Sequence, residues 1–93
     1  MLMYKWISVF IISVVLLTAQ QAEIDSLFMQ ANQAMDEQSY RQAVINYEKI
    51  SQMGIDHPDL YYNLGNAYYR MGIYGQAVWA YEKGLQFTPR DPD

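Results

Sequence analysis

The sequence predicts an all-α fold, in which helix-turn-helix repeats stack as a short right-handed solenoid, preceded by an N-terminal hydrophobic signal helix. Three observations support this prediction. The first 22 residues contain a single charged side chain, Lys5. The remaining residues match themselves at a separation of 34 positions, a length typical of two-helix repeats. Within each repeat, apolar residues recur at three- and four-residue spacings, which places them on one face of a helix.

The N-terminal segment, residues 1–22, has the layout of an export signal. Residues 6–18 are apolar apart from hydroxyl side chains, and they lie between Lys5 and the small, polar stretch 19–22. This order is typical of a secretory signal peptide. Thirteen helical residues span only about 20 Å of a hydrocarbon core of roughly 30 Å, which favours a cleavable signal, cut after Ala19. The alternative is an uncleaved anchor over residues 2–19. Either form predicts export, to the periplasm or to the outer face of the inner membrane.

Residues 58–91 form the repeat with the clearer helix boundaries. Pro58 and Asp59 are favoured in a first helical turn. Gly72 marks a turn, and Pro89 ends the last helix. The first helix is expected to carry an apolar stripe of Tyr61, Leu64, Gly65, Tyr68 and Tyr69. The second, from Tyr74 to about Gln86, is expected to carry a stripe of Ala77, Val78, Tyr81 and Leu85.

Residues 23–57 form a degenerate first copy of this repeat. Ten of the 34 aligned positions are identical, and in the second copy they are Asp59, Asn66, Tyr74, Gln76, Ala77, Val78, Tyr81, Glu82, Lys83 and Gln86. The stripes predicted for the first copy are Leu27, Phe28, Ala31 and Ala34, and then Ala43, Val44, Tyr47 and Ile50. We expect Ala31 and Gly65 to let the partner helix approach closely, with Tyr47 and Tyr81 filling the remaining volume.

The period and these positions resemble the tetratricopeptide repeat. The pattern of that family is present in the second copy as Tyr61, Leu64-Gly65, Tyr68, Ala77, Tyr81 and Pro89. The first copy departs from the pattern at Gln30-Ala31, Ala34 and Ile55, as is common at the end of a solenoid. The resemblance implies a protein-binding module without a cofactor. It also places the start of a third repeat at residues 92–93, so we expect the natural polypeptide to continue past Asp93.

A narrower resemblance concerns the order of the segments. An export signal, a weak repeat and then residues 60–72 are similar to the beginning of the BatE-type proteins of Bacteroides aerotolerance operons. The neighbours of that family are a MoxR-type ATPase and membrane proteins with von Willebrand factor A domains. The resemblance therefore implies these partners and a membrane-associated complex.

Composition and side-chain chemistry argue against catalysis and against nucleic-acid binding. The formal net charge is −4 and the six basic residues are scattered singly, so no patch exists to neutralise phosphates. The absence of cysteine excludes thiolate zinc sites and thiol nucleophiles. His57 with Asp56 and Asp59 is a metal candidate, but this triplet is more typical of a turn and a helix start. Glu48 and Glu82 occupy equivalent, outward-leaning repeat positions and are not a catalytic pair. We predict no enzyme, no metal and no small-molecule substrate.

With catalysis and nucleic-acid binding excluded, the function that remains is binding of a partner protein or peptide. In the family the first helix of each repeat lines a concave groove, and the resemblance places there Phe28, Asn32, Met35, Tyr62, Asn63, Asn66, Tyr69 and Arg70. Asparagine amides can bond an extended backbone, while aromatic and methionine side chains offer apolar contact. Packing of Phe28 and Tyr62 on neighbouring helices is an alternative of equal weight.

Some members of the family clamp a C-terminal carboxylate. Asn32 and Asn63 match the asparagines of that clamp, but Phe28 and Asp93 stand where it needs lysine, so we expect no such clamp. The sequence therefore predicts an exported interaction scaffold. Two alternatives stay open: an auxiliary module of a larger cell-envelope enzyme, and a structural module that self-associates through its uncapped last helix.

Overall fold

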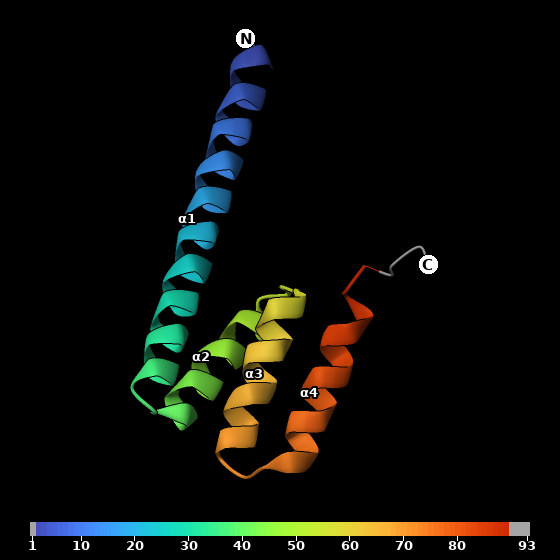
Figure 1. The fold of residues 1–93 in the computed structure, drawn as a ribbon. Coiled ribbons are helices and arrows are strands. Elements are labelled where there is room, and N and C mark those ends of the chain that lie inside the picture. Colours follow the sequence, from blue (N-terminus) through green and yellow to red (C-terminus); the bar gives the residue numbers. More distant parts are fainter. Residues whose placement is uncertain (1, 90–93) are drawn as a thin grey trace.

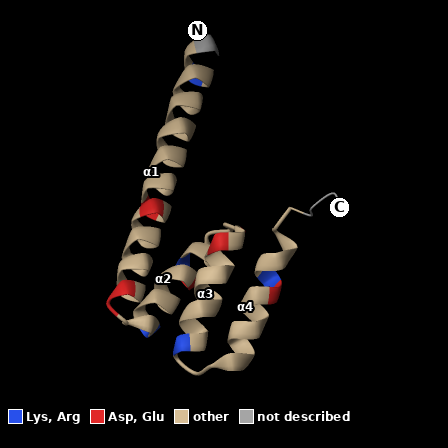
Figure 2. Ribbon diagram, viewed as in Figure 1, with Lys and Arg blue, Asp and Glu red and all other residues tan. Residues whose placement is uncertain are grey.

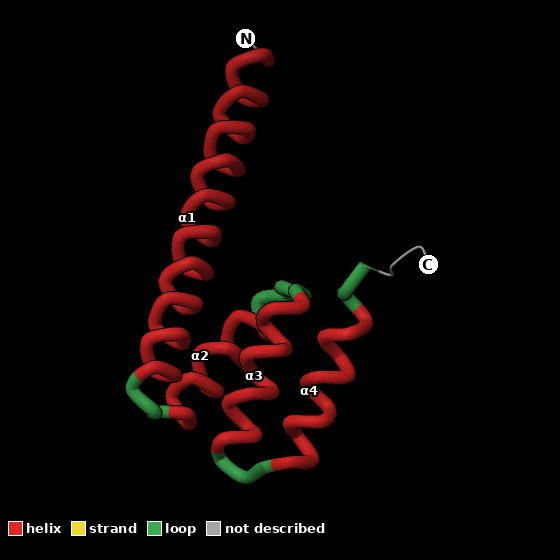
Figure 3. The backbone as a smooth tube through the Cα atoms, viewed as in Figure 1, coloured by secondary structure: helices red, strands yellow, loops and turns green. Residues whose placement is uncertain are grey.

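The described part of the chain is entirely helical. A computed structural model describes the backbone of residues 2–89 and the side chains of residues 4–89, and it contains no strand in that range. The four helices are α1 (Leu2–Asp36), α2 (Tyr40–Gln52), α3 (Pro58–Arg70) and α4 (Tyr74–Gln86), joined by short turns (Figures 1 and 3). Each helix packs on the next one along the chain. The predicted all-α repeat fold is confirmed, whereas residues 92–93, where a third repeat was expected to begin, lie outside the described residues.

Helix α1 combines the predicted signal with the first helix of the first repeat. Its 35 residues rise by about 52 Å at the helical rise per residue, and its N-terminal part stands clear of the other helices (Figure 1). Phe10 is 71% exposed, whereas Ile24 is 5% exposed and is the first residue of the hydrophobic core. Burial therefore changes at the predicted boundary between residues 22 and 23, while the helix continues through it.

The two repeats turn in the same way. Gln38 and Gly72, which are 34 positions apart, have positive φ angles of 61° and 78°. In each turn the next residue closes the same backbone hydrogen bond, from Ser39 N to Ala34 O at 2.7 Å and from Ile73 N to Tyr68 O at 2.9 Å. Glycine adopts this left-handed conformation without strain, whereas a glutamine bears a cost of roughly 1–2 kcal/mol. The prediction that Gly72 marks a turn is confirmed.

The core lies along the contacts between successive helices. Most of its members belong to the predicted stripes, and the buried apolar residues are Ile24, Ala31, Ala34, Ala43, Val44, Tyr47, Ile50, Leu60, Tyr61, Leu64, Ala67, Tyr68, Ala77 and Ala80. A Cβ atom placed on Gly65 would lie 2.6 Å from Cε1 of Tyr81. The predicted close approach at Gly65 is therefore confirmed.

The stripe predicted for α4 is only partly buried. Ala77 is buried, but Val78 is 54% and Leu85 is 72% exposed, and the buried positions are completed by Ala80 and Gly84. The equivalent of Val78 in the first repeat, Val44, is 8% exposed. The difference arises because α3 packs over α2, whereas no described helix follows α4. The spacing of apolar residues cannot distinguish a helix face that packs within the repeat from one that packs on the next repeat.

Gly65→Ala is expected to destabilise the fold by about 1–3 kcal/mol, the usual range for overpacking. The added methyl group overlaps the Tyr81 ring, whose hydroxyl bonds Asn66, so the ring must shift and strain that bond. Gly75→Ala is the matched control, because a Cβ there has no neighbour within 4 Å, and it gains up to about 1 kcal/mol of helix propensity. Urea unfolding of both variants measures the difference. Equal stabilities would contradict the assigned contact.

Candidate partner-binding groove

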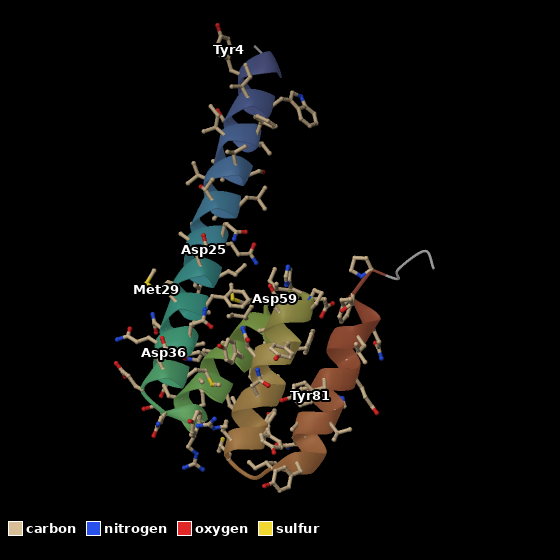
Figure 4. The ribbon with its side chains drawn as sticks, viewed as in Figure 1. Tyr4, Asp25, Met29, Asp36, Asp59 and Tyr81 are labelled. Carbon is tan, nitrogen blue, oxygen red and sulfur yellow. The ribbon has the colours of Figure 1, made fainter. Side chains whose placement is uncertain are left out.

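Two cavities lie between α1 and α3. The first, of about 460 Å³, is at the C-terminal ends of both helices and is lined by Met35, Asp36, Gln38, Tyr40, Asn66, Tyr69 and Arg70. The second, of about 410 Å³, lies toward the N-terminal end of α3 and is lined by Gln21, Ile24, Asp25, Phe28, Asn32, Ile55, His57, Asp59 and Asn63. Figure 4 labels Asp36, which lines the first cavity, and Asp25 and Asp59, which line the second. Together the cavities define what we call the groove.

Seven of the eight residues predicted for a groove line these two cavities. Asn66, Met35, Tyr69 and Arg70 belong to the first cavity, and Phe28, Asn32 and Asn63 to the second. Tyr62 lines neither cavity; it is 60% exposed and its ring lies 6.0 Å from that of Tyr81. The structure thus brings seven of the side chains together, while their role in binding stays a prediction.

The same hydrogen bond holds an asparagine in each repeat. The Tyr47 hydroxyl donates to Oδ1 of Asn32 at 2.6 Å, and the Tyr81 hydroxyl donates to Oδ1 of Asn66. Burial raises the pKa of both tyrosines, so the hydroxyls keep the proton that they donate. Since each asparagine oxygen is engaged, its amide NH2 group is left for the cavity that it lines. The groove therefore presents two amide donors at equivalent positions of the two repeats.

Charge is unevenly distributed along the groove. Among the side chains that line the cavities, Arg70 is basic and Asp25, Asp36 and Asp59 are acidic. Figure 2 shows the basic residue at the C-terminal end of α3. The Arg70 guanidinium lies over the Tyr40 ring, 5.2 Å from its centroid, a cation–π contact that fixes the charge at the mouth of the first cavity. Apolar contact is available beside it from the exposed Tyr69 and the half-buried Met35.

Aromatic packing accounts for part of the surface of Phe28 and Tyr69. The Phe28 ring meets the Tyr47 ring edge-on, with 6.3 Å between their centroids, and the ring centroids of Tyr69 and Tyr74 are 5.4 Å apart. Phe28 is half-buried, whereas Tyr69 is 57% exposed. Packing on neighbours, the alternative weighed for Phe28, is confirmed for part of this side chain, although Phe28 still lines a cavity.

The residues of the metal candidate have other partners. His57 is the N-cap of α3, and its Nδ1 accepts from the backbone amide of Asp59 at 3.1 Å. Asp56 accepts from the Tyr61 hydroxyl at 2.7 Å. The described residues contain no cluster of three metal-ligating side chains. The prediction that this triplet starts a helix is confirmed, and His57 and Asp59 are additional groove-lining residues.

Glu48 does not lean outward, as the repeat pattern had suggested. It is half-buried and accepts a hydrogen bond from the hydroxyl of Tyr68, which joins α2 of the first repeat to α3 of the second. Burial and this bond to Glu48 raise the pKa of Tyr68 to about 12. Its repeat equivalent Glu82 is exposed, because no described helix packs there. Glu48 thus forms a hydrogen bond between the two repeats, whereas Glu82 is a solvated carboxylate.

Several groove residues were missed by sequence reasoning. Asp36, Gln38 and Tyr40 line the first cavity because the turn between α1 and α2 folds beside the end of α3. Ile55 and His57 reach the second cavity from the turn between the repeats. The groove positions taken from the family lie within the first helix of each repeat, so they carried no signal for residues in the turns or at the adjoining helix ends. Of the two lysine positions of the carboxylate clamp, Phe28 lines a cavity and Asp93 lies outside the described residues.

The stacked helix-turn-helix units, with a groove between their first helices, are the architecture of a helical-repeat module. Residues 58–91 match the family model for the tetratricopeptide repeat, and repeats of this family bind protein partners. No curated protein and no solved structure matches the chain. The similarity to the tetratricopeptide repeat thus covers the second repeat, and the structure shows that residues 24–52 pack as the counterpart of that repeat.

Proposed function

We propose that this protein is an exported interaction scaffold that binds an extended segment of a partner protein in the groove. The observation that carries the proposal is the repeated tyrosine–asparagine hydrogen bond, which leaves the amide NH2 groups of Asn32 and Asn66 for a ligand. Two NH2 donors suit ligand carbonyl oxygens, and an extended peptide offers such acceptors along its whole length. Arg70 favours an acidic side chain of the ligand beside the first cavity.

Export rests on α1. By length and composition this helix is able to cross a membrane. The proposal therefore places the groove on the outer side of the cytoplasmic membrane. From the resemblance to BatE-type proteins, we further propose that the protein assembles an aerotolerance-type complex with von Willebrand factor A-domain proteins and a MoxR-type ATPase. No catalytic role is assigned to the groove, and a catalytic domain elsewhere in the polypeptide would make it the auxiliary module of an enzyme.

The test uses peptides selected from a randomised library against the full chain in detergent. Asn66→Asp keeps an oxygen for Tyr81 but removes the NH2 donor, and Arg70→Glu reverses the charge at the cavity. The double variant is expected to bind the selected peptides at least about tenfold more weakly, or 1.4 kcal/mol, with unchanged helicity. Arg41→Glu is the control, because Arg41 is exposed and lines neither groove cavity. If the double variant binds the peptides as tightly as the unmodified protein does, the assignment of the groove as the binding site is wrong.

A second candidate function is association through α4. Val78 and Leu85 are exposed there, although the equivalent of Val78 in α2 is buried under α3. The opposite edge of the module is different. Ser26 and Gln33 are the equivalents of the buried Leu60 and Ala67, and they form exposed hydrogen bonds, Ser26 with Gln30 on α1 and Gln33 with Glu37 just after α1. One edge is thus polar and the other apolar. If α4 mediates self-association, Val78→Glu is expected to lower the molecular mass of the assembly in solution. A mass that does not depend on protein concentration and is unchanged in the variant would exclude this role.

A further inference from the structure

The N-terminal half of α1 exposes a continuous apolar surface. Trp6 is 74%, Phe10 is 71% and Leu17 is 65% exposed, and the most apolar window of the helix is only 6% buried. Figure 2 shows no acidic residue on this half of the helix. A surface of this kind, larger than a soluble protein ordinarily exposes, requires an apolar partner.

The polar groups of this segment are satisfied within the helix. The hydroxyl of Ser8 donates to Tyr4 O at 3.1 Å, and that of Ser13 donates to Val9 O at 2.9 Å. The hydroxyl of Thr18 donates to Val15 O at 2.9 Å. No hydroxyl side chain between residues 7 and 18 therefore needs water as a hydrogen-bond partner. This is the condition that the hydrocarbon core of a bilayer imposes on a spanning helix.

The two ends of the segment suit the two faces of a bilayer. Tyr4, Lys5 and Trp6 supply aromatic rings and a long basic side chain at the N-terminal end, which are favoured at a membrane interface. Glu23 and Asp25 begin the charged surface at the other end. Residues 4–19 rise by about 24 Å, which is shorter than the roughly 30 Å of the hydrocarbon core. Thinning of the bilayer and snorkelling of Lys5 toward the interface cover the difference.

The segment where a signal peptidase would cut is regular helix. Residues 17–24 lie inside α1, without glycine, proline or a turn. A peptide bond in such a helix has its backbone groups engaged, whereas proteolysis concentrates at exposed, irregular segments. Leu17 is also larger than the small residue that a cleavage site after Ala19 requires. Only five residues further on, Ile24 is buried in the core, so packing fixes the helix on the C-terminal side of this segment.

We propose that α1 is retained as a membrane anchor and that it holds the groove rigidly at the bilayer surface. Its partner is the hydrocarbon core of the membrane, over residues 4–19. Gln21 lies two residues beyond this segment and lines the second cavity, so the groove opens directly beside the lipid headgroups. The fold positions the groove for segments that emerge from the same membrane. The proposal rests on the export half of the proposed function.

The first experiment locates the two tryptophans of the full chain in phosphatidylcholine vesicles. The chain has two tryptophans, so Trp79→Phe leaves only Trp6, and Trp6→Phe leaves only Trp79. Lipids brominated in the acyl chains are expected to quench Trp6 several-fold more than Trp79, which lies on α4. Equal quenching of the two would overturn membrane insertion of α1.

Retention is tested by the intact mass of the protein isolated from its native host. The expected mass is that of a chain that keeps residues 1–19, recovered in the membrane fraction. A chain that begins at Gln20 would overturn the anchor. In that case a cysteine introduced at Asp59, in a chain without native cysteine, still reports export through labelling by a membrane-impermeant maleimide. The failure of the anchor and the failure of export are therefore distinguishable.

Rigidity is tested with two insertions after Gln21. Seven alanines continue the helix through almost two full turns. They leave the groove within about 20° of its original orientation and move it about 10 Å further from the bilayer. Seven glycine and serine residues form a flexible linker instead. Energy transfer from a dye at the cysteine that replaces Asp59 to acceptors in the headgroups is expected to report a shift of about 10 Å for alanine and a broadened distribution for glycine-serine. Identical transfer in both insertions would show that α1 does not act as a rod.

Discussion

Tyr61→Ala is expected to destabilise the repeat module by about 3–5 kcal/mol, the range for removal of a fully buried aromatic ring. Tyr61 is fully buried; its ring stacks on Phe87 at 5.6 Å and meets Trp79 edge-on at 6.4 Å. The ammonium of Lys83 lies 5.2 Å from its centroid. Because a small domain has a free energy of unfolding near the low end of about 5–15 kcal/mol, most of the helical signal of α2 to α4 should be lost in thermal unfolding followed by circular dichroism.

The neighbouring tyrosine provides a matched control. Tyr62 is 60% exposed, and Tyr62→Ala is expected to change the stability by less than about 1 kcal/mol. Tyr61→Phe separates the ring from the hydroxyl, which bonds Asp56 at 2.7 Å. Removal of that bond should lower the stability by about 1 kcal/mol. A loss for Tyr61→Ala no larger than that for Tyr62→Ala would contradict the assignment of Tyr61 to the centre of the core.

Alkaline pH is expected to weaken the junction between the repeats through Tyr68. The folded-state pKa of Tyr68 is raised from 10.0 to about 12 by burial and by its bond to Glu48. Folding therefore favours the protonated hydroxyl: its contribution is fully present below pH 10 and is lost as the pH rises toward 12. A shift of this size corresponds to roughly 2–3 kcal/mol. Denaturant unfolding at a series of pH values measures this loss.

Tyr68→Phe isolates this contribution from the other tyrosines. Burial also raises the pKa of Tyr47 and Tyr81, but both remain in the variant, so the difference between the two proteins belongs to Tyr68. The variant should lose about 1.5–3 kcal/mol at neutral pH, the range for a hydrogen bond to a charged group, and the difference should shrink above pH 10. Tyr62→Phe, which removes an exposed hydroxyl, should follow the wild-type curve. A constant difference at all pH values would contradict the raised folded-state pKa of Tyr68.

The groove could be predicted in part because the family period assigns positions on helices. Asn32 and Asn66 share a repeat position, and both prove to bond the tyrosine of the second helix of their own repeat. Tyr62 was included because the family resemblance places its position in the groove. It lines neither cavity, since the groove lies between α1 and α3 and Tyr62 packs toward Tyr81 on α4. The position of a residue along a helix predicts the helix face on which its side chain lies, but it does not predict which neighbouring helix that face meets.

Sequence reasoning was sufficient to predict the helix-turn-helix plan of the two repeats, the turn at Gly72 and the close approach at Gly65. These features depend on spacing and backbone preference within about 34 residues, so a repeated pattern is enough to specify them. The packed structure was needed to establish which apolar residues of α4 are buried, that Glu48 bonds Tyr68, and that the turns contribute to the groove. Each of these depends on whether a neighbouring helix covers a given face. That information lies in the stacking of the repeats, because two equivalent residues such as Val44 and Val78 have the same local sequence signal and different burial.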